Sequence, residues 1–548
     1  MESAMIELET KDDIDMKSDD ERSTTNLEIP EDTKKCVLVK SIFDGERPST
    51  VFFQYNHEVT GLKKKIENNK RICAKNELDW NIKKHRNFCV MYKAYKNIPD
   101  CILIPMKTNG IVRTKSFINA NLIWKLMKVD KMSVLIRKLN KHQRYNHFPC
   151  TWQIGRKDNL WKNYKIMWIQ YPEDYDFIPR TFILPEDQEE MLKEVKSKPE
   201  EMWMIKPVAS SRGRGIRLMT NIDSVPKRCL LSHYIQNPQL INNKKYDLRL
   251  YIVITGFQPL KIYLYEEGLV RFASEEYNMD DSNKHNRYMH LTNYSVNKCS
   301  TLFDSNISTK DECTGSKWSL NALRNYFREN NMDFAPTWEK IKDIVCKSVI
   351  SIADDTIATT KKLTRHKHNL FELYGFDILI DSDLRPWLLE VNLNPSLNSE
   401  SDLDIKVKSA LMTDIYTLVG IVPYARGKEP VSGIGVAATR RKEPKSLHEV
   451  LKKNIKSQEE DDSMTTITSK TDESEEDTTQ ETITYAMDEF SRQGMFQRVF
   501  PLKENIDYYS QFIKQPGEEN IALWNWLKNA PKDSDNLSSV VFGQDFDL

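Results

Sequence analysis

The chain has 548 residues, of which 10% are aromatic and 29% charged, and its 80 basic and 80 acidic side chains give a formal net charge of zero. This length is enough for several domains with a sizeable core. No stretch of about eighteen apolar residues occurs, and the acidic first residues lack the pattern of a signal peptide, which argues against a secreted or membrane protein. The nine cysteines form no C-x-x-C pair, so neither a zinc framework nor redox chemistry is indicated.

The charge is distributed unevenly along the chain. Residues 1–34 carry about −8, residues 459–481 about −9 and residues 482–548 about −4, so residues 35–458 carry about +21. A segment this basic attracts polyanions, namely nucleic acid, an anionic membrane face or an acidic protein surface. The alternative is that the acidic ends only keep the protein soluble.

The amino-terminal half predicts a disordered tail followed by α/β structure. Residues 1–34 lack periodic apolar positions and are expected to be disordered. In residues 35–150, short apolar runs such as KCVLVKSIF and DCILIPM alternate with charged stretches, which indicates an α/β mixture of unassigned topology. Next, DNLWKNYKIMWIQY predicts a helix and WMIKPV a strand, and YDLRLYIVITG and PLKIYLYEEGLVRFAS predict two paired strands.

The strand WMIKPV ends on Lys206 and runs into a loop with two serines and two glycines, one of them Gly213. Glycines let backbone N–H groups approach phosphate oxygens, and a lysine supplies a compact positive charge. The G-x-x-x-x-G-K-[ST] order of a P-loop is missing, so the strand-loop-strand form favours a flap over a triphosphate. A tight turn with basic side chains is the alternative.

Two further segments are candidates for ligand binding. Asp247 and Arg249 lie on one face of a strand, where they either contact a ligand or form a structural ion pair with each other. Arg271 lies near the end of the next strand. The segment MHLTNYSVNK is dense in donors, which suggests a polar ligand or a loop that satisfies its own backbone.

A helical block from about Trp318 to Thr364 leads to FELYGFDILI, DSDLRP and PWLLEVN, which predict a hairpin. A turn centred near Asp383 and Leu384 places Asp377 opposite Glu390, with Asn392 on the same face. Two neighbouring carboxylates repel and are costly to desolvate unless a cation lies between them. Carboxylate and amide oxygens suit Mg²⁺, so the hairpin predicts a magnesium site, with a solvated polar sheet face as the alternative.

Three segments follow Pro423. Residues 426–457 contain RRKEPKSLHEVLKKNIK, which predicts a short basic amphipathic helix, and residues 458–484 have the composition of an acidic linker. Residues 485–548 form a carboxy-terminal extension, and its apolar cluster from FSRQGMFQRVFPL to WNWLKNA could dock back on the body.

A set of motifs occurs in the order and approximate spacing of the tubulin tyrosine ligase-like family, and the resemblance is nearest to its tubulin polyglutamylases. These motifs are IKPVASSRGRGI, SHYIQNPQLI, KYDLRLYI, LVRFAS, HLTNYSVNK, SKW, FELYGFDILID, PWLLEVNLNPSL and DLDIKVKSALMTD. The resemblance covers roughly residues 36–425 and implies an α/β ATP-grasp fold, with an amino-terminal domain at 35–150, a central domain at 151–265 and a carboxy-terminal domain at 266–425. Asn394 departs from the serine usual in relatives, and the region before about Pro99 matches poorly.

The resemblance also implies a reaction. ATP would phosphorylate a glutamate side chain on a tubulin tail, and the amino group of free L-glutamate would attack this acyl phosphate to give an isopeptide bond, ADP and phosphate. The lack of a Ser-His-Asp or Cys-His arrangement fits, since phosphoryl transfer needs positioning and charge neutralisation. We expect a cytoplasmic monomer on microtubules, including those of a cilium or centriole, with no nucleic-acid or membrane partner.

Site residues follow from the matched motifs. The residues implied for ATP are Lys206, Arg212, Gly213, Ser232, His233, Tyr234, Ile235, Lys245, Asp247, Thr292 and Asn293. Those implied for Mg²⁺ are Asp377, Glu390 and Asn392. Those implied for free glutamate are Arg271, Tyr294, Ser295, Lys317 and Lys408. Lys206, Arg271 and Glu390 are expected to be catalytic, and Arg212 to help accept an unmodified side chain of α-tubulin.

The three cations Arg271, Lys317 and Lys408 are more than a glycine or a tyrosine requires, which favours glutamate as the amino acid. A glycylase or tyrosine ligase of the same fold, or a non-catalytic microtubule-binding relative, is the alternative. Residues 436–457 are expected to bind microtubules, because the tails of tubulin are rich in glutamate.

Overall fold

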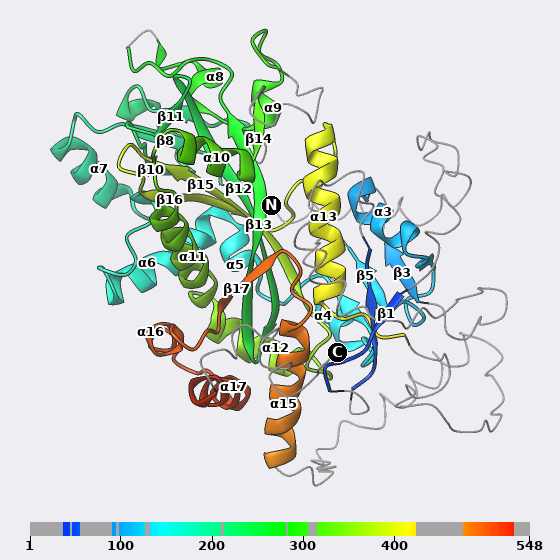
Figure 1. Cartoon of the computed structure of the whole chain (residues 1–548). Helices are drawn as coiled ribbons and strands as arrows, with labels where there is room; N and C mark the ends of the chain where they lie inside the picture. Colours follow the sequence, from blue (N-terminus) through cyan, green and yellow to red (C-terminus); the bar gives the residue numbers. More distant parts are fainter. Residues whose placement is uncertain are drawn as a thin grey trace, which may run out of the picture.

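The computed structural model describes residues 37–43, 47–54, 90–94, 98–125, 132–208, 210, 213–280, 283–304, 315–423 and 475–530 (Figure 1). Several predictions therefore lie outside the described residues: the disordered tail, the role of Arg212, the basic helix in 426–457 and the first part of the acidic linker. Among the described helices, none is both long enough and apolar enough to cross a membrane.

A seven-stranded sheet forms the centre of the molecule (Figure 1). The strands, in the order of the sheet, are β14 (Lys317–Ser319), β13 (Leu260–Phe272), β12 (Lys244–Phe257), β15 (Glu372–Ile380) and β16 (Pro386–Asn392), with β11 (Leu240–Ile241) beside β12 and β17 (Phe496–Phe500) beside β13. All neighbours are antiparallel. The predicted pair of long strands and the predicted hairpin are both confirmed.

A second, four-stranded sheet lies to one side. Its order is β7 (Thr181–Leu184), β10 (Cys229–His233), β8 (Trp203–Lys206) and β9 (Arg217–Leu218). Trp203 and Ile205 pack into a small core with Met191 of α7 (Gln188–Ser197), while Met204 contributes to a different cluster on the opposite face. Because side chains alternate along a strand, Lys206 shares the face of Met204 and points away from the small core.

The amino-terminal part is the expected α/β mixture. Its parallel sheet has the order β4 (Val112–Arg113), β3 (Met91–Ala94), β5 (Leu122–Trp124) and β6 (Arg144–Tyr145), and β1 (Val37–Val39) pairs with β2 (Thr50–Phe52). DCILIPM forms α3 (Asp100–Thr108), which packs against α13 (Asp402–Leu418), and α4 (Met132–Arg137) follows β5.

Helices form where the sequence predicts them. The segment DNLWKNYKIMWIQY lies in α6 (Lys157–Gln170), which follows the short α5 (Trp152–Gly155). The block from Trp318 to Thr364 contains α10 (Leu320–Glu329), α11 (Ala335–Ile350) and α12 (Ala353–Leu363). Its first residues belong instead to β14, which pairs with β13. Two one-turn helices, α8 (Arg287–His290) and α9 (Tyr294–Asn297), lie between β13 and β14 in the chain.

The carboxy-terminal extension completes the central sheet. It contains α15 (Glu475–Phe490), β17, α16 (Ile506–Ser510) and α17 (Glu518–Asn529), and β17 pairs with the segment Ile262–Tyr265 of β13. Glu489, which is 2% exposed, forms an ion pair with Lys261 at 2.7 Å and accepts a hydrogen bond from the Tyr263 hydroxyl at 2.7 Å. The expected docking on the body is therefore confirmed.

Two of the segment boundaries expected from the sequence fall inside a helix or a strand of the structure. Helix α15 begins at Glu475, inside the segment 458–484 expected to be a linker. The boundary expected between residues 265 and 266 falls inside β13, which pairs with β12 over most of its length.

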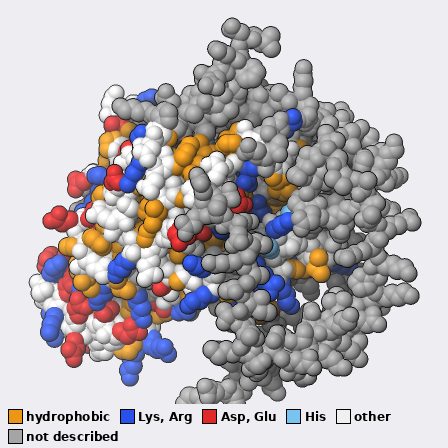
Figure 2. Space-filling view, turned by 90° about the horizontal axis from the view of Figure 1, so that it is seen from below, with side chains coloured by type: hydrophobic (Ala, Val, Ile, Leu, Met, Phe, Trp, Pro, Cys, Tyr) orange, Lys and Arg blue, Asp and Glu red, His pale blue; other side chains and the backbone are white. Residues whose placement is uncertain are grey.

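On the face seen in Figure 2, basic and acidic side chains of the described residues are interspersed.

Candidate functional site

Two adjoining cavities lie beside the central sheet. The inner cavity, of about 90 Å³, lies between the four-stranded sheet and strands β12, β15 and β16. The outer cavity, of about 630 Å³, extends from β13 and β14 to α13 and the amino-terminal part. Asn293 and Glu390 line both cavities, so the two meet at these residues.

Most of the residues implied for ATP line the inner cavity: Lys206, His233, Tyr234, Ile235, Lys245, Asp247, Thr292 and Asn293. Gly213 lies close by with φ +69°, and a Cβ atom there would be 2.9 Å from Asn293 Oδ1, so only glycine permits this approach. Ser232 accepts a hydrogen bond from the Thr181 hydroxyl at 2.9 Å and lines a separate small cavity with Lys206. Among the described residues implied for ATP, the structure therefore brings all but Ser232 together at the inner cavity.

Two lysines give the inner cavity its electrostatic character. Burial, together with the neighbouring charge of Lys157, lowers the pKa of Lys206 to about 8. Burial lowers the pKa of Lys245 to about 7, and its Nζ donates to the Tyr234 hydroxyl at 3.1 Å. Within the described residues neither lysine forms an ion pair. An anionic ligand in the inner cavity would therefore meet two amino groups that no carboxylate of the described residues contacts directly.

The carboxylates and arginines of the central sheet pair across strands. Asp247 lies opposite Arg271, and Arg249 opposite Asp377. Arg271 Nε donates to Asp247 at 2.8 Å, and Arg249 donates to both oxygens of Asp377 at 2.6 and 3.0 Å. Arg271 also lies 2.9 Å from Asp377. Asp247 and Arg249 therefore make ion pairs with neighbouring strands and not with each other.

All four side chains of this row are buried. Burial by itself raises the pKa of Asp377, but Arg249 and Arg271 outweigh it and hold the pKa well below its ordinary value. Asp377 is therefore an ionised carboxylate whose charge is already balanced by two guanidinium groups.

The hairpin has the predicted pairing of Asp377 with Glu390, reached through a register shift because Ile378 pairs with Leu388. Glu390 forms an ion pair with Lys157 at 2.7 Å and accepts a hydrogen bond from the Asn392 amide at 3.1 Å. Protein side chains therefore supply positive charge beside both carboxylates: Arg249 and Arg271 beside Asp377, and Lys157 beside Glu390. No group of three or more His, Cys, Asp and Glu residues with the arrangement of a metal site occurs in the described part of the chain.

The residues implied for free glutamate, Arg271, Tyr294, Ser295, Lys317 and Lys408, all line the outer cavity. Asp404 lies 2.7 Å from Lys317 and 2.6 Å from Lys408. Burial raises the pKa of Asp404, but these two lysines lower it below its ordinary value. The three cations counted as available for glutamate are thus each in contact with a protein carboxylate, and their number alone does not explain a preference for glutamate.

Sequence reasoning missed Lys157 and Asp404. Lys157 is the first residue of α6, and nothing in its local sequence connects it with a hairpin more than 200 residues away. Asp404 stands in the first turn of α13, where its backbone N–H donates to the hydroxyl of the helix N-cap Ser401 at 3.2 Å. The S-x-x-D pattern of a capped helix start was the available signal for Asp404.

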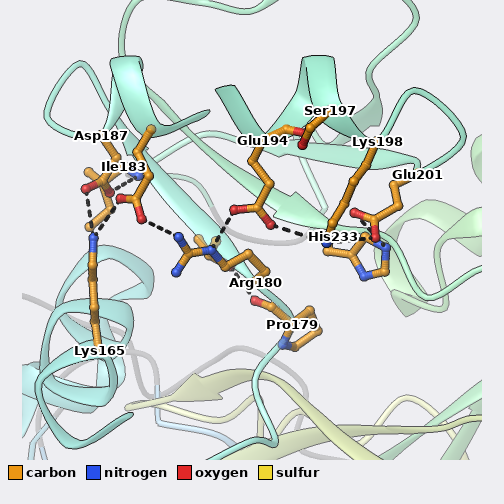
Figure 3. A network of polar contacts seen from close by, with 12 residues as sticks. Lys165, Pro179, Arg180, Ile183, Asp187, Glu194, Ser197, Lys198, Glu201 and His233 are labelled. Carbon is orange, nitrogen blue, oxygen red and sulfur yellow. Dashed lines mark hydrogen bonds and ion pairs between the residues drawn. The ribbon is translucent and has the colours of Figure 1, made fainter. Parts of the chain in front are cut away.

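A polar network fixes the four-stranded sheet on the side of α7 (Figure 3). Arg180 forms ion pairs with Glu190 and Glu194, the latter at 3.2 Å, and Lys165 lies 3.2 Å from Asp187. His233 lies at the end of this network, 3.8 Å from Glu201, and also lines the inner cavity. Burial lowers the pKa of His233, so the imidazole is neutral at neutral pH.

Comparisons with known proteins place the chain in one family. The model of the "Tubulin-tyrosine ligase family" matches residues 135–429. The chain is 36% identical over 407 residues to "Tubulin monoglutamylase TTLL4" of Mus musculus, an alignment that covers 71% of this chain and 34% of the relative. It is 38% identical over 409 residues to "Tubulin polyglutamylase TTLL5" of Homo sapiens, covering 71% and 31%.

A nematode relative is shorter. The chain is 34% identical over 397 residues to "Tubulin polyglutamylase ttll-4" of Caenorhabditis briggsae, covering 72% of this chain and 65% of the relative. The chain thus spans about a third of the length of the mammalian relatives and just under two thirds of the nematode one.

Proposed function

Because the chain belongs to the tubulin-tyrosine ligase family, we propose that it is an ATP-dependent ligase that joins free L-glutamate to glutamate side chains in the tails of tubulin. Relatives named as tubulin monoglutamylase and polyglutamylase support this proposal. The observation that carries it is the pair of adjoining cavities that meet at Glu390, one with two amino groups that no carboxylate of the described residues contacts directly and one with cations in its wall. Two substrates bound in the two cavities would lie side by side.

In this proposal ATP binds at the inner cavity in an ATP-grasp arrangement, between the four-stranded and the central sheet. Because the cavity is only about 90 Å³, the two sheets must move apart to admit the whole nucleotide. Lys206 and Lys245 bind phosphate oxygens, because both are cations without an ion-pair partner among the described residues. The loop at Gly213 lies over Asn293 and brings backbone N–H groups toward the phosphates. The residues of the chain position the nucleotide and neutralise its charge, which is most of what phosphoryl transfer requires.

Mg²⁺ fits the donor set at the junction of the cavities. Glu390 and Asn392 offer a carboxylate and an amide oxygen that line the outer cavity. Asp377 can join them only by sharing oxygens that already accept from arginines, which a carboxylate with several lone pairs permits. When bound, Mg²⁺ would supply neutralisation of the charge that develops on the phosphate oxygens. Lys157 holds Glu390 in place.

The outer cavity holds free glutamate. Arg271, Lys317 and Lys408 orient its carboxylates, and Tyr294 and Ser295 line the same wall. These groups bind and orient the amino acid so that its amino group faces the acyl phosphate formed on the tubulin tail. Arg212 would help accept an unmodified tail of α-tubulin, and residues 436–457 would contact the acidic microtubule surface. Such an enzyme would act on the microtubule cytoskeleton, including that of cilia and centrioles.

Incorporation of radiolabelled amino acids into purified microtubules tests the proposed function. We expect ATP- and Mg²⁺-dependent incorporation of glutamate, and none of glycine or tyrosine. Mass spectrometry of the tails would then locate the isopeptide bond. Binding to microtubules without incorporation of any amino acid would contradict the proposal and favour a non-catalytic role. Lys206→Met is the matched negative control, since it removes a cation of the inner cavity and leaves the outer cavity unchanged.

A further inference from the structure

The charges in the wall of the outer cavity are nearly all paired within the described residues. Arg249 and Arg271 contact carboxylates of the central sheet, and Lys317 and Lys408 contact Asp404. On the acidic side, Glu372 faces His147 at 2.8 Å and Glu390 faces Lys157 at 2.7 Å.

Two charged side chains of this wall are exceptions. Lys298 is exposed and, within the described residues, has no carboxylate partner; its Nζ lies 5.8 Å from the centre of the Tyr294 ring. Glu400 is also exposed, and the Tyr294 hydroxyl is its hydrogen-bond partner. No cation of the described part of the chain forms an ion pair with Glu400. The outer cavity therefore presents one positive and one negative group available to a ligand.

The Tyr294 side chain connects these two groups. Its ring lies against Lys317, with the Nζ 3.9 Å from the ring centre, and more loosely against Lys298. Burial and the hydrogen bond to Glu400 raise the pKa of Tyr294 to about 12, so the hydroxyl keeps its proton and orients the carboxylate of Glu400. Lys298, Lys317 and Glu400 are thus arranged about a single aromatic side chain.

The backbone that carries Lys298 is firmly anchored. The preceding residue, Asn297, is 1% exposed, and its side chain accepts hydrogen bonds from the backbone N–H and the hydroxyl of Ser274, both at 2.8 Å. The Asn297 amide also donates to the Leu291 carbonyl at 2.7 Å. Ser274 lies two residues after the end of β13, the strand of Arg271. The start of the Lys298 side chain is therefore fixed relative to the predicted glutamate-binding residues.

We propose that Lys298 binds the side-chain carboxylate of the incoming amino acid and that Glu400 binds its ammonium group. The proposal rests on the proposed ligase function and adds the two residues that select an amino acid with an acidic side chain. Arg271, Lys317 and Lys408 then bind the α-carboxylate alone and not both carboxylates. Glycine has no group for Lys298, and glutamine offers a neutral amide in place of the carboxylate. Since a hydrogen bond between charged groups is stronger than one to a neutral group, Lys298 discriminates among amino acids of similar size.

Steady-state kinetics of the full chain with L-glutamate and L-glutamine test this assignment. Lys298→Met should raise the KM for glutamate by about tenfold and leave the KM for ATP unchanged, because the lost contact is a charge-assisted hydrogen bond. The preference for glutamate over glutamine should fall by the same factor, and Lys298→Arg should restore most of it. Glu400→Gln should raise the KM for glutamate and the KM for glutamine by the same factor. Lys361→Met, an exposed lysine on α12 outside both cavities, is the control.

An unchanged preference for glutamate over glutamine in Lys298→Met would overturn the assignment. Equilibrium dialysis of radiolabelled L-glutamate, with a non-hydrolysable ATP analogue present, separates this result from failure of the proposed function. If the unmodified protein ligates no amino acid, the ligase proposal fails. Loss of glutamate binding in Lys298→Met, but not in Lys361→Met, would still support the binding site, and equal binding by both variants would refute it.

Discussion

The affinity for ATP should fall as the pH rises from 7 to 9, because Lys206 loses its proton in this range. Burial and the nearby charge of Lys157 lower the pKa of Lys206 to about 8, whereas most lysines keep their proton at that pH. Phosphate oxygens bind the ammonium form. The free protein must therefore hold, or take up, a proton at Lys206 when ATP binds.

The size of the effect follows from the protonated fraction. The apparent dissociation constant equals the intrinsic one divided by the fraction of molecules in the binding-competent state, and for a pKa near 8 that fraction falls from about 90% at pH 7 to about 10% at pH 9. Lys206 alone thus weakens ATP binding about tenfold over this range. Lys245, with a pKa of about 7, increases the loss to the extent that its charge also contacts phosphate.

Isothermal titration calorimetry with a non-hydrolysable ATP analogue between pH 6.5 and 9.5 measures this dependence. Lys206→Arg is the matched control, because a guanidinium stays charged throughout, and its loss of affinity should be about tenfold smaller than that of the unmodified protein. A dissociation constant that is flat between pH 7 and 9, or the same rise in both proteins, would refute the reasoning.

Alkaline unfolding would not imitate this result. The pKa of Lys206 in the folded protein is lower than the ordinary value of 10.5, so the unfolded chain binds more protons between about pH 8 and pH 10.5. The contribution of this group to the free energy of unfolding therefore rises with pH in that window. A fall in ATP affinity without a fall in stability would identify the binding site as the cause.

Three further substitutions test separate parts of the structure. Glu390→Gln should abolish ligation and largely preserve co-sedimentation with microtubules; appreciable turnover would remove Glu390 from the proposed magnesium site. Arg271→Ala should raise the KM for glutamate far more than that for ATP, and equal effects on both would mean that Arg271 is structural or serves the nucleotide. Lys261→Met leaves the buried carboxylate of Glu489 without its cation and should lower the free energy of unfolding by about 3–5 kcal/mol in urea titrations. The double variant Lys261→Met/Glu489→Gln should recover much of this loss, and a double variant as unstable as the single one would contradict the role of the ion pair.

Local sequence patterns determined the main strands and the faces on which their polar side chains lie. Alternation in YDLRLYIVITG predicts Asp247 and Arg249 on one face, and the two apolar arms around DSDLRP predict the pairing of Asp377 with Glu390, which the structure confirms. Such features depend on residues close together in the chain, where strand periodicity and turn residues act directly. The motifs in their order also predicted the family, which the comparison confirms.

Tertiary structure alone decided which charges meet. Arg249 and Arg271 both contact Asp377 because β12 lies between β13 and β15 in the sheet, an order that no local pattern contains. In the same way α6 brings Lys157 to Glu390, and the packing of α13 beside β14 brings Asp404 to Lys317. The contact of Asp404 with Lys408 is different, because the two residues are four apart on one helix and their pairing is a local feature of the sequence. A sequence shows how many charged groups a site has, but whether they are paired depends on the packing of distant elements, since a charge interaction acts over a few ångströms in space at any separation along the chain.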